Sequence, residues 1–439
     1  AMCVVLFGVG AATADAGATK TPPLRERFVS LLNAEERAEL LFLEHQGWRL
    51  VPSTEVDTVT VQGGFPCQRR TLEEAHEAGD LQILVPPTAT DDDLRAMGKR
   101  LPALVDSRPS RGAHQLRTIP ATVAATRKLT ENTDRGWYIF PQVFMFDSLW
   151  FKMIPPEPEW LWDKWLCVGQ AKPSDAMSSF YDRKCTAECY VGQWVALYTI
   201  QYEIFGEPLF DEAFQPEEFT FGRPGNQRKS PIGKYVTAEY SQGWRVMLVP
   251  PDQWQADMGL TLARLGPTAF VGASGVVENV MEGMDTNDNM VIVSVSDKAN
   301  QLLLENGGFA YIRTLTEEIW EIHRTGRRGY TPGSSGGEAP KKIEEVMEDP
   351  ALSEIIVYVH PFGVLPLGEV VRKRIGRTHK PMKVRLYDNG LADFFYKRYH
   401  AAIVKRILAG KPIPPATVRE VNLYERPPPL VKPGLGANN

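Results

Sequence analysis

The segment from about Glu188 to Phe205 is the strongest helix signal in this chain. It is apolar along most of its length, its large side chains recur at near-helical spacing, and Gly206 ends it. Cys189 falls in the first turn of this expected helix. The N-terminus of a helix carries unpaired N–H groups and partial positive charge, which lower the pKa of a thiol and favour the thiolate. Cys189 is therefore a candidate nucleophile, with a buried structural cysteine as the alternative.

The length and composition of the chain exclude several classes of protein. Its 439 residues are enough for two or three domains. With 43% hydrophobic and 23% charged residues, it is not a disordered, collagen-like or coiled-coil chain. The net charge of −5 argues against a surface built throughout to coat nucleic acid.

The apolar stretch from Cys3 to Ala12 is much shorter than the roughly 20 residues that a membrane helix needs. We therefore expect no transmembrane segment. A buried strand is the favoured interpretation of this stretch, and the remnant of a secretory signal is the alternative.

Five cysteines are few and odd in number for this length, which favours free thiols over a disulfide scaffold. Cys185 and Cys189 are four residues apart, but no Cys or His follows at the spacing of a structural zinc site. The run Gly8-Val9-Gly10 lacks the third glycine of a dinucleotide-binding loop. We expect neither a metal nor an organic cofactor.

Composition and turn signals divide the chain into three parts. We expect an N-terminal α+β domain over residues 1–130, a central domain over 131–332, and a basic C-terminal domain with a Pro-rich tail over 341–439. The stretch 331–340, rich in Gly, Ser and Pro, is the expected linker between the last two.

Short-range patterns predict the individual elements. Asn33 with Glu36 and Thr71 with Glu74 are helix-capping pairs, and Asp91 to Asp93 are expected to cap a third helix. Strands are expected over 58–62, 81–85, 244–249, 276–281, 290–295, 309–312 and 355–359, and further helices over 316–323 and 390–409.

Five short patterns in the central part occur in a distinctive order. They are Glu188-Cys189-Tyr190, Phe210-Asp211-Glu212-Ala213-Phe214, Val246-Met247-Leu248-Val249-Pro250-Pro251-Asp252, Glu278-Asn279-Val280 and Thr316-Glu317-Glu318-Ile319. Together they resemble the bacterial spore-coat type protein-glutamine γ-glutamyltransferases, a transglutaminase family on an NlpC/P60-like, papain-type fold. The resemblance covers about residues 180 to 330, which is less than half of the chain.

The resemblance implies an α+β fold with a papain-like (NlpC/P60-type) cysteine transferase core and added N-terminal and C-terminal domains. It implies that Cys189 is the nucleophile and that Glu278 and Glu188 are the candidate bases. The implied enzyme is a protein-glutamine γ-glutamyltransferase, which joins a Gln donor protein to a Lys acceptor protein through a Cys thioester.

Two alternatives stay open beside this function. A protein glutamine deamidase or thiol hydrolase would use the same site, because water that reaches the thioester replaces the amine. A non-enzymatic binding or assembly protein would use the basic C-terminal region instead. A reduced nucleophile is compatible with the cytoplasm and with a secreted effector, so the compartment stays open.

The chain departs from the family pattern in two places. The family has a Trp shortly before Glu-Asn-Val, where this chain has Gly275-Val276-Val277. The family also has a His in a Gly-rich context on the next strand, whereas residues 284–311 contain no His. His360, which follows an apolar strand pattern, is the candidate replacement, with a loop or capping role as the alternative.

The segment 370–412 is strongly basic. It contains 12 Lys or Arg against two Asp, a net charge of +10, so the rest of the chain carries −15. One interpretation is that it docks on acidic residues of its own chain. The other is that it binds an acidic partner, a membrane surface or nucleic acid.

Overall fold

The computed structural model describes residues 23–62, 69, 71–131, 151–154, 164–167, 171–182, 189–216, 219–221, 270–279, 288–326, 342–359, 362–386 and 390–414. The N-terminal apolar stretch, the strand expected over 244–249, the expected linker and the tail beyond residue 414 lie outside these ranges. In the described ranges the fold is mixed α and β, as the sequence predicts.

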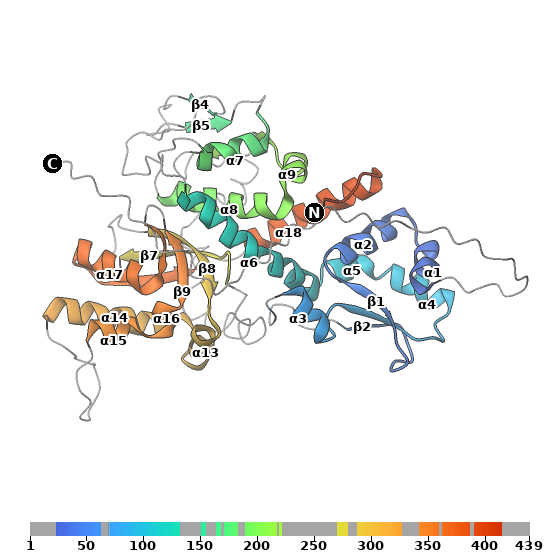
Figure 1. The fold of residues 1–439 in the computed structure, drawn as a ribbon, viewed down its shortest axis with the longest axis horizontal. Helices are drawn as coiled ribbons and strands as arrows, with labels where there is room; N and C mark the ends of the chain where they lie inside the picture. Colours follow the sequence, from blue (N-terminus) through green and yellow to red (C-terminus); the bar gives the residue numbers. More distant parts are fainter. Residues whose placement is uncertain are drawn as a thin grey trace, which may run out of the picture.

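The N-terminal part contains a three-stranded sheet. Its order is β1 (Arg49–Pro52), β3 (Gln82–Val85), β2 (Thr60–Gln62), with β1 parallel and β2 antiparallel to β3. The helices of this part are α1 (Leu24–Leu31), α2 (Ala34–His45), α3 (Leu72–Glu77), α4 (Asp91–Gly98), α5 (Leu101–Val105) and α6 (Arg108–Glu131). The last of these is long and leads toward the rest of the molecule (Figure 1).

Local capping residues fix where these helices begin. The Asn33 side chain accepts from the N–H of Glu36, whose carboxylate accepts in return from the N–H of Asn33, as expected. Thr71 accepts from Glu74 N–H, also as expected. At the third helix the prediction is wrong by one residue. Thr90 is the N-cap, and Asp93 completes its capping box.

In the next part of the chain, the described residues form a small antiparallel sheet and three helices. The sheet order is β4 (Phe151–Ile154), β5 (Lys164–Cys167), β6 (Thr220–Phe221). The helices are α7 (Pro173–Asp182), α8 (Cys189–Phe205) and α9 (Glu207–Ala213). The bounds of α8 confirm the helix expected from the sequence.

A five-stranded antiparallel sheet forms the centre of the remaining structure. Its order is β10 (Gly363–Pro366), β9 (Ile355–Val359), β8 (Asp288–Val295), β7 (Ser274–Asn279), β11 (Met382–Leu386). The accompanying helices are α13 (Asp297–Glu305), α14 (Phe309–Thr325), α15 (Ile343–Met347), α16 (Pro350–Ser353), α17 (Leu367–Thr378) and α18 (Gly390–Leu408). The sheet combines strands from both sides of residues 331–340.

The sheet is buried on both faces. Val276 and Val291 belong to one core cluster, which also contains side chains of α6, α8 and α18. Their strand neighbours Val277 and Ile292 belong to a second cluster with side chains of α13 to α17. Because side chains alternate along a strand, the two clusters lie on opposite faces. Figure 1 shows α6 and α8 on one side of the sheet and α14 to α16 on the other.

One strand prediction is wrong. Residues 309–312, expected to form a strand, are the first turn of α14. The short apolar run looks like a strand, but Ile312, Leu315 and Ile319 are all buried and continue it at helical spacing. The apolar face of a long helix therefore overrides the local strand preference of this run.

A polar cluster inside the protein connects α2, α6 and α18. The Arg117 guanidinium donates to the Tyr399 hydroxyl at 2.9 Å and to the main-chain carbonyl of His45. The oxygen of Tyr399 lies 2.7 Å from His45 Nε2. Since Tyr399 accepts from Arg117, its own proton is directed at His45 Nε2, which must then be an unprotonated acceptor.

Two histidines in and beside this cluster stay neutral far below their usual pKa. Burial, followed by the nearby charge of Arg117, lowers the pKa of His45 to about 3. The same causes lower the pKa of His114 to about 3. His114 packs edge-on against the ring of Tyr396 at 5.3 Å, so a charged imidazolium would face an aromatic, desolvated environment.

The free energy of unfolding is expected to fall as the pH drops below about 6.5. In that range unfolded His45 and His114 take up protons, while the folded forms stay neutral down to about pH 3. The loss is about 1.4 kcal/mol per pH unit for each histidine. Urea unfolding between pH 5 and 6.5 measures it, because most carboxylates titrate lower.

The variant His114→Phe keeps an aromatic ring in the cluster and removes one of the two titrating groups. Its unfolding free energy should depend on pH about half as steeply as that of the parent in this window. An unchanged slope would show that His114 is not a neutral buried histidine.

Candidate functional site

The helix that carries the candidate nucleophile begins where the sequence predicts. The first residue of α8 is Cys189. The helix that follows is apolar, and Val195, Ala196 and Ile200 are almost completely buried. Glu188, the neighbouring candidate base, lies outside the described residues.

A buried glutamine fixes the beginning of α8 to the central sheet. The side-chain amide of Gln193 donates to the main-chain carbonyls of Gly275 in β7 and Met290 in β8, at 3.0 and 2.7 Å. Gly275 and Met290 lie opposite each other in the antiparallel ladder. Gln193 is only 3% exposed, so these hydrogen bonds are shielded from water. They hold one turn of the helix against two adjacent strands.

Glu278, the other candidate base, lies on β7 on the face that α8 covers. It is two residues from Val276, which packs in the cluster that includes α8, and side chains two residues apart share a face. The carboxylate forms an ion pair with Lys383 of β11, with Nζ 3.1 Å from Oε1. Lys383 is directly opposite Glu278 in the strand register. The two side chains are 13% and 23% exposed, so the pair is largely buried.

The Gln193 anchor gives the chain distance of each candidate from one contact between α8 and the sheet. Cys189 precedes Gln193 by four residues, which is one helical turn or about 6 Å along the axis. Glu278 follows Gly275 by three residues, or about 10 Å of strand. The structure thus brings the beginning of α8 and the Glu278 strand to the same side of one sheet.

His360, the remaining histidine candidate, lies outside the described residues. The described residues contain no group of three or more His, Cys, Asp or Glu that could hold a metal. In the same ranges, none of the helices is long and apolar enough to cross a bilayer.

Sequence reasoning misses two residues that shape the site. Gln193 has a recognisable signal, since it is a polar side chain within an otherwise apolar helix. Lys383 is one of the 12 Lys and Arg residues of the basic segment, and nothing in the local sequence distinguishes it. Its pairing with Glu278 depends on the register of two strands that are far apart in the sequence. A pattern search in one segment does not reveal such a contact.

The basic segment 370–412 is partly neutralised within the chain. Its ion pairs include Arg372–Glu369, Arg374–Asp288, Lys383–Glu278, Arg406–Glu212 and Lys411–Glu212. Some of the carboxylates come from other elements, β7, β8 and α9. These contacts favour the interpretation that the segment docks on its own chain.

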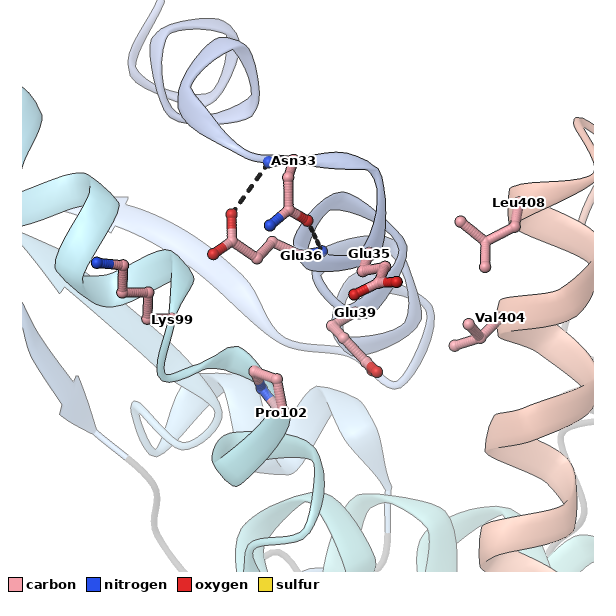
Figure 2. A pocket seen from close by; sticks show the side chains of 8 residues that line it. All are labelled: Asn33, Glu35, Glu36, Glu39, Lys99, Pro102, Val404 and Leu408. Carbon is pink, nitrogen blue, oxygen red and sulfur yellow. Dashed lines mark hydrogen bonds between the residues drawn. The ribbon is translucent and has the colours of Figure 1, made fainter.

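A separate groove of about 520 Å³ lies between the N-terminal helices and α18. Figure 2 shows Glu35 and Glu39 of α2 facing Val404 and Leu408 of α18. The Oε2 atom of Glu39 also lies 2.6 Å from Nε2 of His400, at hydrogen-bond distance. Since the lining contains no residue of α8 or β7, the groove is distinct from the candidate site.

Comparison of the chain with protein-family models, curated proteins and solved structures finds no match.

Replacing Gln193 with Leu should lower the free energy of unfolding by about 1–3 kcal/mol, because two buried carbonyls lose a donor. A shift of the urea midpoint at unchanged slope measures the loss. Thr199→Val is the matched control on the same helix. The Thr199 hydroxyl donates to Val195 O within α8 and does not link the helix to the sheet in the part of the chain that the structure describes, so this variant should cost less than about 1 kcal/mol. Equal losses in both variants would argue against the Gln193 anchor.

Proposed function

We propose that this protein is a cysteine-dependent acyltransferase with a papain-like core, which acts on protein glutamine side chains and joins them to lysine amines. One observation carries the proposal. A buried helix that begins at Cys189 is attached through Gln193 to the sheet face that carries Glu278. This chemistry requires at least a thiol nucleophile and a carboxyl group that transfers protons.

The position of Cys189 favours a reactive thiolate. The aligned peptide dipoles of α8 place partial positive charge at the helix N-terminus, which stabilises an anion there. The apolar surroundings of the later turns reduce the screening of this dipole by water. Such an arrangement lowers the pKa of a thiol and raises the fraction of the nucleophilic form.

The proposed reaction proceeds in two halves. The Cys189 thiolate attacks the γ-carbonyl carbon of a glutamine, the C–N bond breaks, and the nitrogen leaves as ammonia after it takes up a proton. A thioester remains on the enzyme. The lysine amine then attacks the thioester carbon and gives up a proton, the C–S bond breaks, and an isopeptide bond and the thiolate result.

A carboxyl group is suited to both proton transfers. As the carboxylic acid it delivers its proton to the leaving nitrogen in the first half, and the carboxylate that remains accepts a proton from the lysine amine in the second, which restores the acid. Glu278 and Glu188 are the proposed carboxylates. The ammonium of Lys383 fixes the orientation of the Glu278 side chain, since the two groups pair across adjacent strands.

The test is incubation of the full chain with a glutamine-rich protein and a labelled primary amine. The parent should incorporate the amine, and Cys189→Ala should abolish incorporation. Cys185→Ala is the control, because this cysteine lies four residues earlier and has no proposed role. Equal activity of Cys189→Ala and the parent would contradict the proposal.

The mass of the substrate protein distinguishes the alternatives. A gain of about 1 Da per site without amine incorporation means that water resolves the thioester, and the enzyme is then a deamidase. If the mass of the substrate does not change and thiol reagents do not label Cys189 in the native protein, the result favours a binding or assembly protein.

Glu278→Gln tests the proposed base. The variant keeps the shape of the side chain but removes its proton-transfer function, so amine incorporation should fall by about 10²-fold or more. The dependence of the residual rate on pH should also change. A variant as active as the parent would assign the proton transfers elsewhere, with Glu188→Gln as the next candidate.

A further inference from the structure

Two exposed histidines from different helices approach each other closely. His323 lies in the last turn of α14, and His379 is the residue that caps the C-terminal end of α17. The Nε2 atom of His323 is 3.2 Å from the Nδ1 atom of His379. Both side chains are open to solvent. Neither residue belongs to the candidate catalytic site.

The surroundings hold the two rings in place. Buried side chains of α14 and α17 pack in the same core cluster, so the helices that carry the histidines are fixed relative to each other. The ring of Trp320 stacks on that of His323, with centroids 6.0 Å apart and planes at 29°. The two imidazoles are themselves stacked at 29°.

The backbone at His379 is unusual for a residue other than glycine. Its φ of 51° and ψ of 40° place it in the left-handed region, and its N–H bonds to Ile375 O at 2.8 Å. Glycine is the usual residue at such a helix end because it has no Cβ. Histidine is one of the few other residues enriched in this conformation, and the cap fixes the position from which the imidazole of His379 extends.

The distance between the two nitrogens matches joint ligation of one metal ion. Metal–imidazole bonds of about 2.0–2.1 Å at ligand angles between 90° and tetrahedral place the two nitrogens about 2.9–3.4 Å apart. We propose that His323 and His379 form a surface site for a divalent transition-metal ion, with two protein ligands and water at the other positions. Cu²⁺ should bind more tightly than Zn²⁺.

The nearest charged residues on α14 do not oppose a bound cation. Arg324, next to His323, directs its guanidinium at the carboxylate of Glu321, with Nε 3.0 Å from Oε2. The charge of Arg324 is therefore offset by an acidic group, while Lys380, the residue after His379, adds a cation on the other side of the pair. The competing explanation of the short distance is a direct N–H···N hydrogen bond between two neutral imidazoles.

The experiment is calorimetric titration of the untagged full chain with CuCl₂ and with ZnCl₂ in a non-coordinating buffer. The expected result is one site, with Cu²⁺ tighter than Zn²⁺. His323→Ala and His379→Ala should each weaken binding at least about tenfold. His360→Ala is the control and should leave the affinity unchanged, whereas Cys189→Ala identifies any metal held by the proposed thiolate and not by the histidines.

Fluorescence gives a second readout. Bound Cu²⁺ should quench the emission of Trp320, which stacks on His323, and Trp320→Phe should lose this component while it retains binding. Circular dichroism confirms that each variant is folded. The proposal is overturned if the parent shows no site, or if either histidine variant binds both metals as tightly as the parent. Binding lost only in Cys189→Ala would also overturn it.

Discussion

The burial of α8 is the constraint on which the central part of the structure depends. Its 17 residues include one charged side chain, Glu203, and that carboxylate is paired with Lys128 of α6. A helix that is apolar on nearly all sides is stable in water only when other elements enclose it. Here α6, the central sheet and the aromatic side chains around Tyr198, which include Phe214, Phe219 and Phe395, provide that enclosure.

The enclosure of α8 also determines where chemistry is feasible. Once a helix is surrounded along its sides, its ends are the places where backbone groups without helix partners meet other molecules. Gln193 fixes the orientation of the first half of the helix with two hydrogen bonds to the sheet. The strand that receives one of them continues to Glu278. At the other end of the helix, Tyr399 of α18 packs on Phe205, with ring centroids 4.9 Å apart. The fold and the proposed site thus rest on the same contacts.

Local patterns in the sequence predict elements well and their assembly poorly. The bounds of α8, the capping box at Asn33 and the strands β7, β8 and β9 follow from hydrophobic periodicity and capping, which act within a few residues. The pairing of β8 with β9, and of β7 with β11, joins segments separated by many residues. That register depends on side chains packing on both faces of the sheet. The ion pair of Glu278 with Lys383 is a consequence of this register, so the sequence suggests the carboxylate but not its partner.

The central claim is that the beginning of α8 activates Cys189 while the protein is folded. The most direct measurement is the rate of alkylation of Cys189 by iodoacetamide at about pH 6, with the modified cysteine identified by peptide mass spectrometry, in the native protein and in urea. The account predicts that native Cys189 reacts faster than the same cysteine in the unfolded chain. A Cys189 that stays protected until the protein unfolds would contradict it.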